Sequence, residues 1–178
     1  LLNKNGNEIY DSIKSIKKNG LTKKIGISIY DFDTLDKILK KFKFDLVQVP
    51  LNILDQRLLK TGWLKRLKRR KIKIHVRSIF LQGILLLKYN QLPKKLKKFK
   101  KNWIIWESWL KKNKFIPLQV CLSFILKQNE LDGIIMGCND KNQLDQILNQ
   151  KQIKNGFLLP DFNIKNSKLI DPRAWCNK

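Results

Sequence analysis

The segment Lys73–Leu87 (KIHVRSIFLQGILLL) changes character along its length in a way that a simple core strand does not. It begins as an apolar, β-branched run of the kind that forms a buried parallel strand, and it then passes through Arg77, Ser78 and Gln82 to Gly83. In α/β folds, binding sites are built where parallel strands end. We therefore expect the polar groups at the end of this strand to face a ligand.

Strand-like and helical periods alternate along the rest of the chain. Strands are predicted at Lys24–Tyr30, Asp45–Pro50, the start of Lys73–Leu87, and Gly133–Gly137. Between and around them the spacing of apolar residues predicts six helices. The first three are a helix through Ile9, Ile13 and Ile16, a helix that begins after Asp31 or Asp33, and a helix at Leu58–Lys71. The last three are a helix at Lys94–Asn113, a helix that begins at Pro117, and a helix after Asn139 or Asp140 that carries Leu144, Ile147 and Leu148.

This order of elements predicts an α/β fold with a parallel sheet and right-handed crossovers. Four such units fit either a small open sheet or half of an eight-stranded βα barrel. The chain begins with Leu1 and opens on a helix that would complete a preceding unit, which favours a partial (β/α)8 TIM barrel, made of half of the eight strands. We expect residues 1–153 to form this half as a single domain, and residues 154–178 to form a C-terminal tail.

Composition limits the possible locations and chemistries. The sequence is 43% hydrophobic but has no run near the ~20 apolar residues that span a bilayer, and its first residues lack the layout of a secretion signal. A cytoplasmic protein is expected. The three cysteines, Cys121, Cys138 and Cys176, are widely spaced and accompany a single histidine, so neither a disulfide framework nor a metal site is predicted.

The formal charge of +24 is carried mainly by residues 59–114, which hold +18, against +4 for residues 1–58 and +2 for residues 115–178. Lysine supplies 32 of the 38 cations, whereas nucleic-acid surfaces favour arginine and exposed aromatic side chains. Here Phe99, Trp103 and Trp106 recur on one helix face, which predicts that they are buried. A solvated basic face is favoured, and a nucleic-acid-binding module remains the alternative.

Four sequence blocks together resemble a known family. They are IGISIYD at residues 25–31, FDLVQVPLN at 44–52, HVRSIFLQGILL at 75–86 and IIMGCNDKNQLDQIL at 134–148. In order and spacing they resemble the second half of the aldo/keto reductases, and most closely the bacterial members with an Arg-Ser-x-Phe-Leu-Gln-Gly block. The resemblance implies a βα barrel that reduces aldehydes and ketones with NADPH, or less often with NADH.

The resemblance assigns two residues to the nicotinamide carboxamide. Ser28 matches a serine that hydrogen-bonds this group, but Ile29 stands where the family usually has an asparagine. Gln48 matches the glutamine that holds the same carboxamide, and its side chain offers both a donor and an acceptor. A buried amide without partners is costly, so Gln48 is less easily explained by structure alone than Ser28, which could simply end a strand.

The block around Arg77 is expected to lie along the cofactor. Arg77 stands where many relatives have a tyrosine under the nicotinamide, and its guanidinium can stack, bind the pyrophosphate, or bind an acidic substrate. Ser78, Phe80 and Gln82 fall in the loop that wraps the pyrophosphate in the family.

The last block implies a phosphate contact at the start of a helix. Gly137, Cys138, Asn139 and Gln143 match family positions there, where free backbone N–H groups and the helix dipole favour an anion. None of residues 138–140 is basic, so none can bind a 2′-phosphate through a positive charge. The expected preference for NADPH over NADH therefore rests only on the resemblance to the family.

The resemblance also implies what this chain lacks. The family's catalytic Asp, Tyr, Lys and His lie on the first four strands of the barrel, and the tyrosine is the proton donor. The sole histidine, His75, lies within a strand where the family has no catalytic group. The chain alone is therefore expected to be inactive, to lack the N-terminal half of the barrel as its partner, and to act on a carbonyl substrate only with it. A non-catalytic scaffold derived from a reductase is a further alternative.

Overall fold

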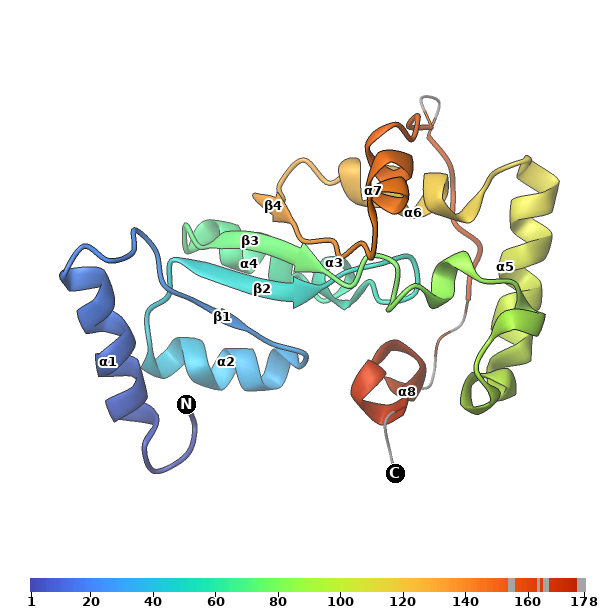
Figure 1. The fold of residues 1–178 in the computed structure, drawn as a ribbon. Coiled ribbons are helices and arrows are strands. Elements are labelled where there is room, and N and C mark those ends of the chain that lie inside the picture. Colours follow the sequence, from blue (N-terminus) through green and yellow to red (C-terminus); the bar gives the residue numbers. More distant parts are fainter. Residues whose placement is uncertain (154–155, 163, 165–166, 176–178) are drawn as a thin grey trace. The chain divides into compact units, whose positions relative to one another are not determined.

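The structure is a computed structural model that describes residues 1–153, 156–162, 164 and 167–175. Cys176 therefore lies outside the described residues. The chain divides into two compact units, each treated by itself below (Figure 1). The first unit comprises Leu1–Pro50, Arg57–Arg77 and Glu130–Ile134, and the second comprises Leu51–Gln56, Ser78–Asn129 and Ile135–Lys178.

The first unit is built on a four-stranded parallel sheet. Its strands are β1 (Gly26–Ser28), β2 (Leu46–Pro50), β3 (Lys73–Arg77) and β4 (Gly133–Ile134), and they lie in this order. Every neighbouring pair is parallel. The prediction of an α/β fold with a parallel sheet is confirmed. The edge strands β1 and β4 are shorter than predicted because, among the described residues, each is paired on one side only.

The two faces of the sheet differ in chemistry. On one face, Val47, Val49, Ile74 and Val76 are fully buried. The opposite face carries Ser28, Gln48 and His75, which are adjacent because Ser28 pairs with Gln48 and Gln48 pairs with His75. Alternation along each strand thus separates an apolar core face from a polar face.

Four helices accompany this sheet, namely α1 (Gly6–Lys18), α2 (Phe32–Lys41), α3 (Arg57–Lys60) and α4 (Trp63–Arg69). Asp31 begins α2 and its carboxylate accepts the N–H groups of Asp33 at 3.2 Å and Thr34 at 2.8 Å, so Asp31, rather than Asp33, is the cap. The single helix expected at Leu58–Lys71 is divided, because Gly62 adopts φ of 76° between α3 and α4.

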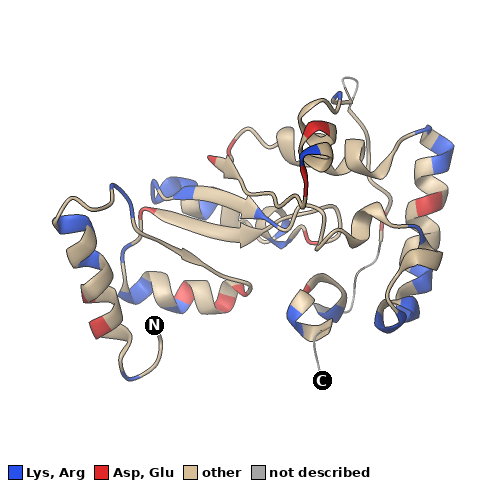
Figure 2. Cartoon of the chain, in the orientation of Figure 1, with Lys and Arg blue, Asp and Glu red and all other residues tan. Residues whose placement is uncertain are grey.

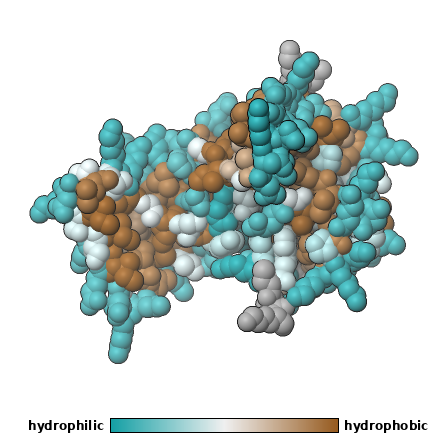
Figure 3. Space-filling view, viewed as in Figure 1, coloured by the Kyte–Doolittle hydropathy of each residue, from teal (hydrophilic) through white to brown (hydrophobic). Residues whose placement is uncertain are grey.

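The apolar stripe of α1 is not buried as its period predicts. Ile9 is 48% exposed and Ile16 is 44% exposed. Figure 3 shows the corresponding apolar surface on this part of the molecule. The sequence pattern correctly identified the helix, but no described element of the first unit covers its apolar face.

The second unit is helical. Its elements are the 3-10 helices η1 (Ile84–Leu86), η2 (Tyr89–Gln91), η3 (Lys94–Phe99) and η4 (Pro172–Trp175), and the helices α5 (Lys100–Asn113), α6 (Pro117–Leu126), α7 (Lys141–Leu148) and α8 (Ser167–Ile170). The helix expected at Lys94–Asn113 begins as η3 because Leu96 and Phe99, three residues apart, share the buried side of a 3-10 turn.

The tryptophans of α5 belong to the core of the second unit. Trp103 and Trp106 are 1% and 2% exposed, and their indole N–H groups donate to the carbonyls of Leu87 and Leu85, both at 3.2 Å. Their predicted burial is confirmed. The tail contributes to the same core through Phe162, Leu169 and Ile170.

The cations lie outside this core, and Figure 2 shows many of them on α5 and on the segment that leads into it. Across the described residues, no helix has the length and apolar character that a membrane crossing requires. The same residues contain no group of three or more potential metal ligands. Cys121 is a buried free thiol whose pKa is raised by burial, and Cys138 is an exposed one.

Candidate functional site

Three of the predicted site residues meet at the carboxyl ends of the strands in the first unit. Ser28 ends β1, Gln48 lies near the end of β2 and Arg77 ends β3. Because the strands are parallel and neighbouring, their polar side chains converge on one edge of the sheet. Arg77, the polar residue predicted at the end of β3, therefore lies beside Ser28 of β1 and Gln48 of β2.

A chain of hydrogen bonds links these three side chains. The Arg77 Nε–H donates to Ser28 Oγ at 3.3 Å, and the Ser28 hydroxyl donates to Gln48 Oε1 at 3.0 Å. Arg77 Nη2 also donates to the carbonyl of Ile29 at 3.1 Å. Each link fixes the orientation of the next, so the cluster holds its polar atoms in defined positions.

The ring of Tyr30 packs against the guanidinium of Arg77, and the sequence did not assign Tyr30 to the site. The centre of the guanidinium lies 3.9 Å from the centroid of the Tyr30 ring. Stacking of this kind restrains the plane of the guanidinium. The available signal was an aromatic residue two positions after Ser28, just beyond a strand whose neighbours already formed the site.

Gln48 retains hydrogen-bonding capacity for a ligand. Its Oε1 accepts from Ser28, whereas its side-chain N–H₂ donates to none of the described residues. The side chain is half-buried, at the junction between the strand ends and solvent. An amide held by its oxygen, with its donors available, is suited to a carbonyl oxygen on a planar ligand.

His75 lies on the same face of the sheet but outside this hydrogen-bonded cluster. Its ring packs over Gly133 of β4, where an added Cβ would lie 2.7 Å from His75 Cδ2 and 2.8 Å from Nε2. The imidazole of His75 makes no hydrogen bond to a described residue. Gly133 thus provides the space that the imidazole occupies.

The predicted loop residues Ser78, Phe80 and Gln82 belong to the second unit. Ser78 and Gln82 adopt φ of 58° and 56°, and Leu81 between them adopts 47°. Left-handed backbone is unfavourable for non-glycine residues, so this run is held in place by its surroundings. Phe80 contributes by packing against the buried core of this unit.

Asn52 is a second residue that the sequence analysis did not assign to the site. It is fully buried, and its Nδ2 donates to the carbonyl of Ser78 at 3.1 Å. Its Oδ1 accepts the N–H groups of Leu54 at 3.0 Å and Asp55 at 2.8 Å. Asn52 therefore ties the strained loop to the turn after β2, and its place directly after the QVPL run was the available signal.

Gly137, Cys138, Asn139 and Gln143 lie at the start of α7, also in the second unit. Asp140 caps this helix by accepting the N–H of Gln143 at 2.8 Å, and Gln143 Oε1 accepts the N–H of Asn139 at 2.9 Å. Two of the N–H groups expected to be available for a phosphate are thus engaged within the cap. Leu148, on the apolar stripe of α7, is 69% exposed.

Comparison with known proteins gives a consistent result. The sequence profile of the Aldo/keto reductase family matches residues 4–155. Among solved structures, the fold is similar to aldo-keto reductase AKR11C1 from Bacillus halodurans, with a TM-score of 0.62 for both its holo and apo forms. Sequence identity is 18% and 16%, over 84% and 86% of this chain.

The chain spans about half the length of these structures, covering 52% of the holo chain and 54% of the apo chain. A comparison with curated proteins found no match.

Proposed function

The chain belongs to the aldo/keto reductase family, and from that premise we propose that it is the cofactor-binding second half of a carbonyl-reducing barrel, with strands five to eight as β1–β4. Support comes from a sheet of four parallel strands, half of the eight in a full (β/α)8 barrel. Further support comes from the bacterial Arg-Ser-x-Phe-Leu-Gln-Gly block, which runs from Arg77 to Gly83. On this proposal residues 1–153 are barrel and residues 154–178 are the tail.

The cluster of Ser28, Gln48 and Arg77 is the observation that carries this proposal. Its donor set fits the nicotinamide end of NADPH, because the Gln48 N–H₂ can donate to a carboxamide oxygen while Ser28 orients Gln48. Arg77, whose guanidinium lies over the ring of Tyr30, presents a planar group where relatives have an aromatic ring. NADH satisfies the same contacts. When bound, the cofactor supplies the hydride that reduces an aldehyde or ketone.

The remaining predicted residues would hold the phosphates of the cofactor. In the family, the segment of Ser78, Phe80 and Gln82 follows the pyrophosphate. Ser78, Leu81 and Gln82 in this segment have left-handed backbone, and turns that contain such residues can direct backbone N–H groups toward an anion. At α7, Gly137, Cys138 and Asn139 lead into the helix, and Gln143 shapes this turn through its bond to Asn139.

Catalysis requires residues beyond this set. In the family a tyrosine donates the proton to the carbonyl oxygen, and an aspartate, a lysine and a histidine assist it from the first four strands. Among the described residues, His75 on the polar sheet face packs against Gly133, and the ring of Tyr30 lies against Arg77. The N-terminal half of the barrel is then the required partner, with a cytoplasmic setting and a small carbonyl compound as substrate.

Titration of NADPH into the 178-residue chain, followed by nicotinamide fluorescence, tests the proposal. We expect saturable binding that Gln48→Leu weakens, and no oxidation of NADPH by simple aldehydes. Addition of a separately produced N-terminal barrel half should restore turnover. Robust turnover by the chain alone, or absence of any NADPH binding, would contradict the proposal.

The alternative candidate is a nucleic-acid-binding module, favoured by the charge of +18 on residues 59–114. Its prediction is oligonucleotide binding that weakens steeply with salt, because each neutralised phosphate releases a counterion. Trp103 and Trp106 are buried in the core, which removes two of the aromatic side chains that such a surface would use for stacking.

A further inference from the structure

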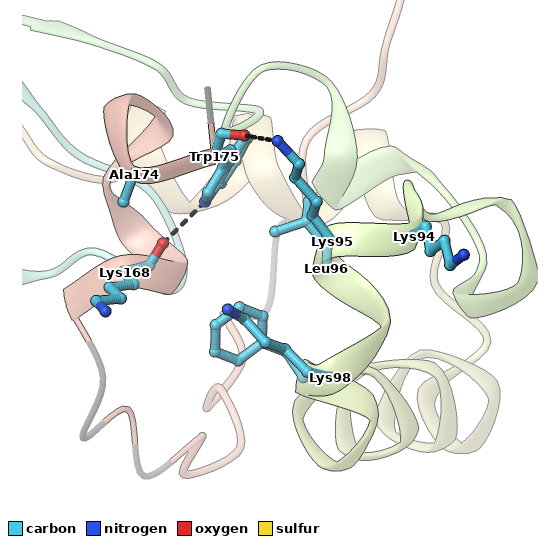
Figure 4. Close-up of a pocket in the computed structure, with 8 residues that line it drawn as sticks. Lys94, Lys95, Leu96, Lys98, Lys168, Ala174 and Trp175 are labelled. Atoms are coloured by element: carbon cyan, nitrogen blue, oxygen red, sulfur yellow. Dashed lines mark hydrogen bonds between the residues drawn. The ribbon is translucent and has the colours of Figure 1, made fainter. Parts of the chain in front are cut away.

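A concave site lies in the second unit. It is a pocket of about 460 Å³ between η3 and the segment formed by α8 and η4 (Figure 4). None of its lining residues falls within the four blocks at 25–31, 44–52, 75–86 and 134–148. Its volume is typical of pockets that hold a small organic ligand.

The pocket is strongly cationic. Four lysines line it, and none of its eight lining residues is acidic. They are Lys94, Lys95, Lys98 and Lys168. Figure 4 shows the ammonium groups of Lys95 and Lys98 on the side of Trp175, whereas that of Lys94 is directed away from it, so an anion in the pocket would be attracted chiefly by Lys95 and Lys98. Lysine is a common partner of phosphate, where it acts as a compact point charge.

The walls and floor of the pocket are aromatic and apolar. Phe99 and Leu96 are buried at its base, and Trp175 forms part of the opposite wall. The Trp175 indole N–H donates to the carbonyl of Lys168 at 2.8 Å, and Lys95 Nζ donates to the carbonyl of Trp175 at 3.4 Å, as Figure 4 shows. These bonds fix the indole beside the ammonium groups.

The wall from the tail is anchored rather than loosely placed. Leu169 and Ile170 of α8 are 1% and 7% exposed and belong to the core of the second unit. The pocket therefore joins segments about 70 residues apart in sequence through core packing. A ligand entering it meets a surface that is largely formed in advance, which reduces the entropic cost of binding.

We propose that this pocket binds a small organic phosphate that carries a planar ring, with the lysines contacting the phosphate and Trp175 stacking on the ring. A bounded pocket favours a small molecule over an extended polymer. The site is independent of the nicotinamide cluster in the first unit, so it stands whether or not the chain binds NADPH there.

Calorimetric titration of the 178-residue chain with AMP, ribose 5-phosphate and adenosine tests both halves of this proposal. AMP should bind more tightly than ribose 5-phosphate by about tenfold, since base stacking on an aromatic side chain contributes about 1–3 kcal/mol. Adenosine, without phosphate, should bind far more weakly than AMP. Equal affinity for AMP and ribose 5-phosphate would overturn the stacking role, and equal affinity for AMP and adenosine would overturn the phosphate role.

Paired variants separate local contacts from net charge. The double variant Lys95→Gln/Lys98→Gln should weaken AMP binding by about tenfold or more. Lys97→Gln/Lys101→Gln removes the same charge from neighbouring residues that do not line the pocket, and it should change the affinity by less than about twofold. Equal losses in the two variants would overturn the site. Circular dichroism of each variant checks that the fold is retained.

Trp175→Leu tests the stacking wall, with Trp175→Phe as its conservative counterpart. Leucine should weaken AMP binding while leaving ribose 5-phosphate binding nearly unchanged, and phenylalanine should retain most of the affinity for AMP. A loss of both ligands in the leucine variant would indicate collapse of the pocket and contradict the stacking role.

Competition experiments identify the source of the phosphate. Saturating NADPH should leave AMP binding intact, because the proposal places the two in separate sites. Displacement of AMP by NADPH would assign the pocket to the dinucleotide and overturn an independent site. A thymidine decamer that binds more tightly than AMP, and that Lys95→Gln/Lys98→Gln abolishes, would overturn the small-molecule proposal in favour of nucleic acid.

Discussion

The amino and carboxyl ends of the same sheet are built from opposite chemistry. At the amino ends, Asp45 and Asp132 each precede a strand and accept the backbone N–H of a residue at the start of a neighbouring strand. At the carboxyl ends, Ser28, Gln48 and Arg77 form the polar cluster. In parallel α/β barrels the first end serves stability and the second carries binding sites, and the function proposed above assigns the two ends of this sheet in the same way.

The carboxylates at the amino ends are fully engaged. Asp132 accepts from the N–H of Ile74 at 3.0 Å and pairs with Lys73 at 2.6 Å and Lys68 at 3.4 Å. Burial alone would raise the pKa of Asp132, but these hydrogen bonds outweigh it and lower the pKa to about 2. Asp45, paired with Lys17 at 2.6 Å, has its pKa lowered for the same reason.

The carboxyl-end cluster contains no carboxylate, and the Gln48 side-chain N–H₂ is bonded to no described residue. The two ends therefore differ in whether their polar side chains keep hydrogen-bonding atoms available. Ion pairs that satisfy every atom stabilise the fold, whereas side chains held by one atom retain others for a ligand.

The largest effect on stability is expected at the amino end, from Asp132→Asn. The substitution removes the charge that Lys73 and Lys68 pair with and weakens the bond from the Ile74 N–H. The lowered pKa corresponds to about 2 kcal/mol, reduced toward about 1 kcal/mol because both lysines are partly exposed to solvent. Urea unfolding measures this change. The control is Asp11→Asn, because Asp11 is exposed and its carboxylate bonds to no described residue. If Asp11→Asn lowers the free energy of unfolding as much as Asp132→Asn does, the carboxylates at the amino ends have no special role in stability.

The same carboxylate predicts how stability depends on acid. Asp132 has a folded pKa of about 2 against an ordinary value of 3.8, so its contribution is complete above pH 3.8 and is lost as the pH falls toward 2. The unfolding free energy of the wild-type chain should therefore decrease across this window. In Asp132→Asn the unfolding free energy should decrease less steeply with falling pH. If the wild-type chain and the variant show the same slope, Asp132 does not cause the loss of stability in acid.

At the carboxyl end, Gln48→Leu should separate binding from stability. It removes the donor proposed for the carboxamide, so NADPH affinity should fall about tenfold, which corresponds to about 1.4 kcal/mol. The free energy of unfolding should change by less than about 0.5 kcal/mol, because only the bond from Ser28 is lost. Gln152→Leu, at an exposed position, controls for the added apolar surface. A loss of stability without a loss of affinity would assign Gln48 to the fold instead.

The smallest effect is expected for the contact between Arg77 and Tyr30. A double-mutant cycle with Arg77→Met and Tyr30→Leu should give a coupling energy of about 0.5–1 kcal/mol in NADPH binding. Coupling in unfolding but not in binding would mean that Tyr30 supports the strand end and not the ligand site.

The sequence predicted the strands and helices whose signals are local. Alternating valines and isoleucines identified β2 and β3, and the polar residues before α2 and α7 narrowed each cap to two candidates, of which the structure selects Asp31 and Asp140. The division at Gly62 and the 3-10 turn of η3 were missed, because a glycine within an apolar helical period is compatible with either conformation until packing decides.

The site was predictable only in part. Ser28, Gln48 and Arg77 were identified, and the sheet brings them together. Tyr30 and Asn52 were missed because their roles depend on contacts with residues 47 and 26 positions away. The basic pocket could not be predicted from the sequence for the same reason. Its lysines in η3 form a pocket only because Lys168, Ala174 and Trp175 of the tail lie opposite them, and nothing local in the sequence indicates that contact.

The two aspartates at the amino ends also imply an order of assembly. The bond from Ile25 to Asp45 closes a separation of 20 residues, whereas that from Ile74 to Asp132 closes 58. The longer closure costs about 1 kcal/mol more in chain entropy before any pairing compensates for it. We therefore expect β1 and β2 to associate early during folding, and β4 to join β3 last, after the intervening helices have formed. The edge at β4 is then the part of the sheet that stays open longest as the chain folds.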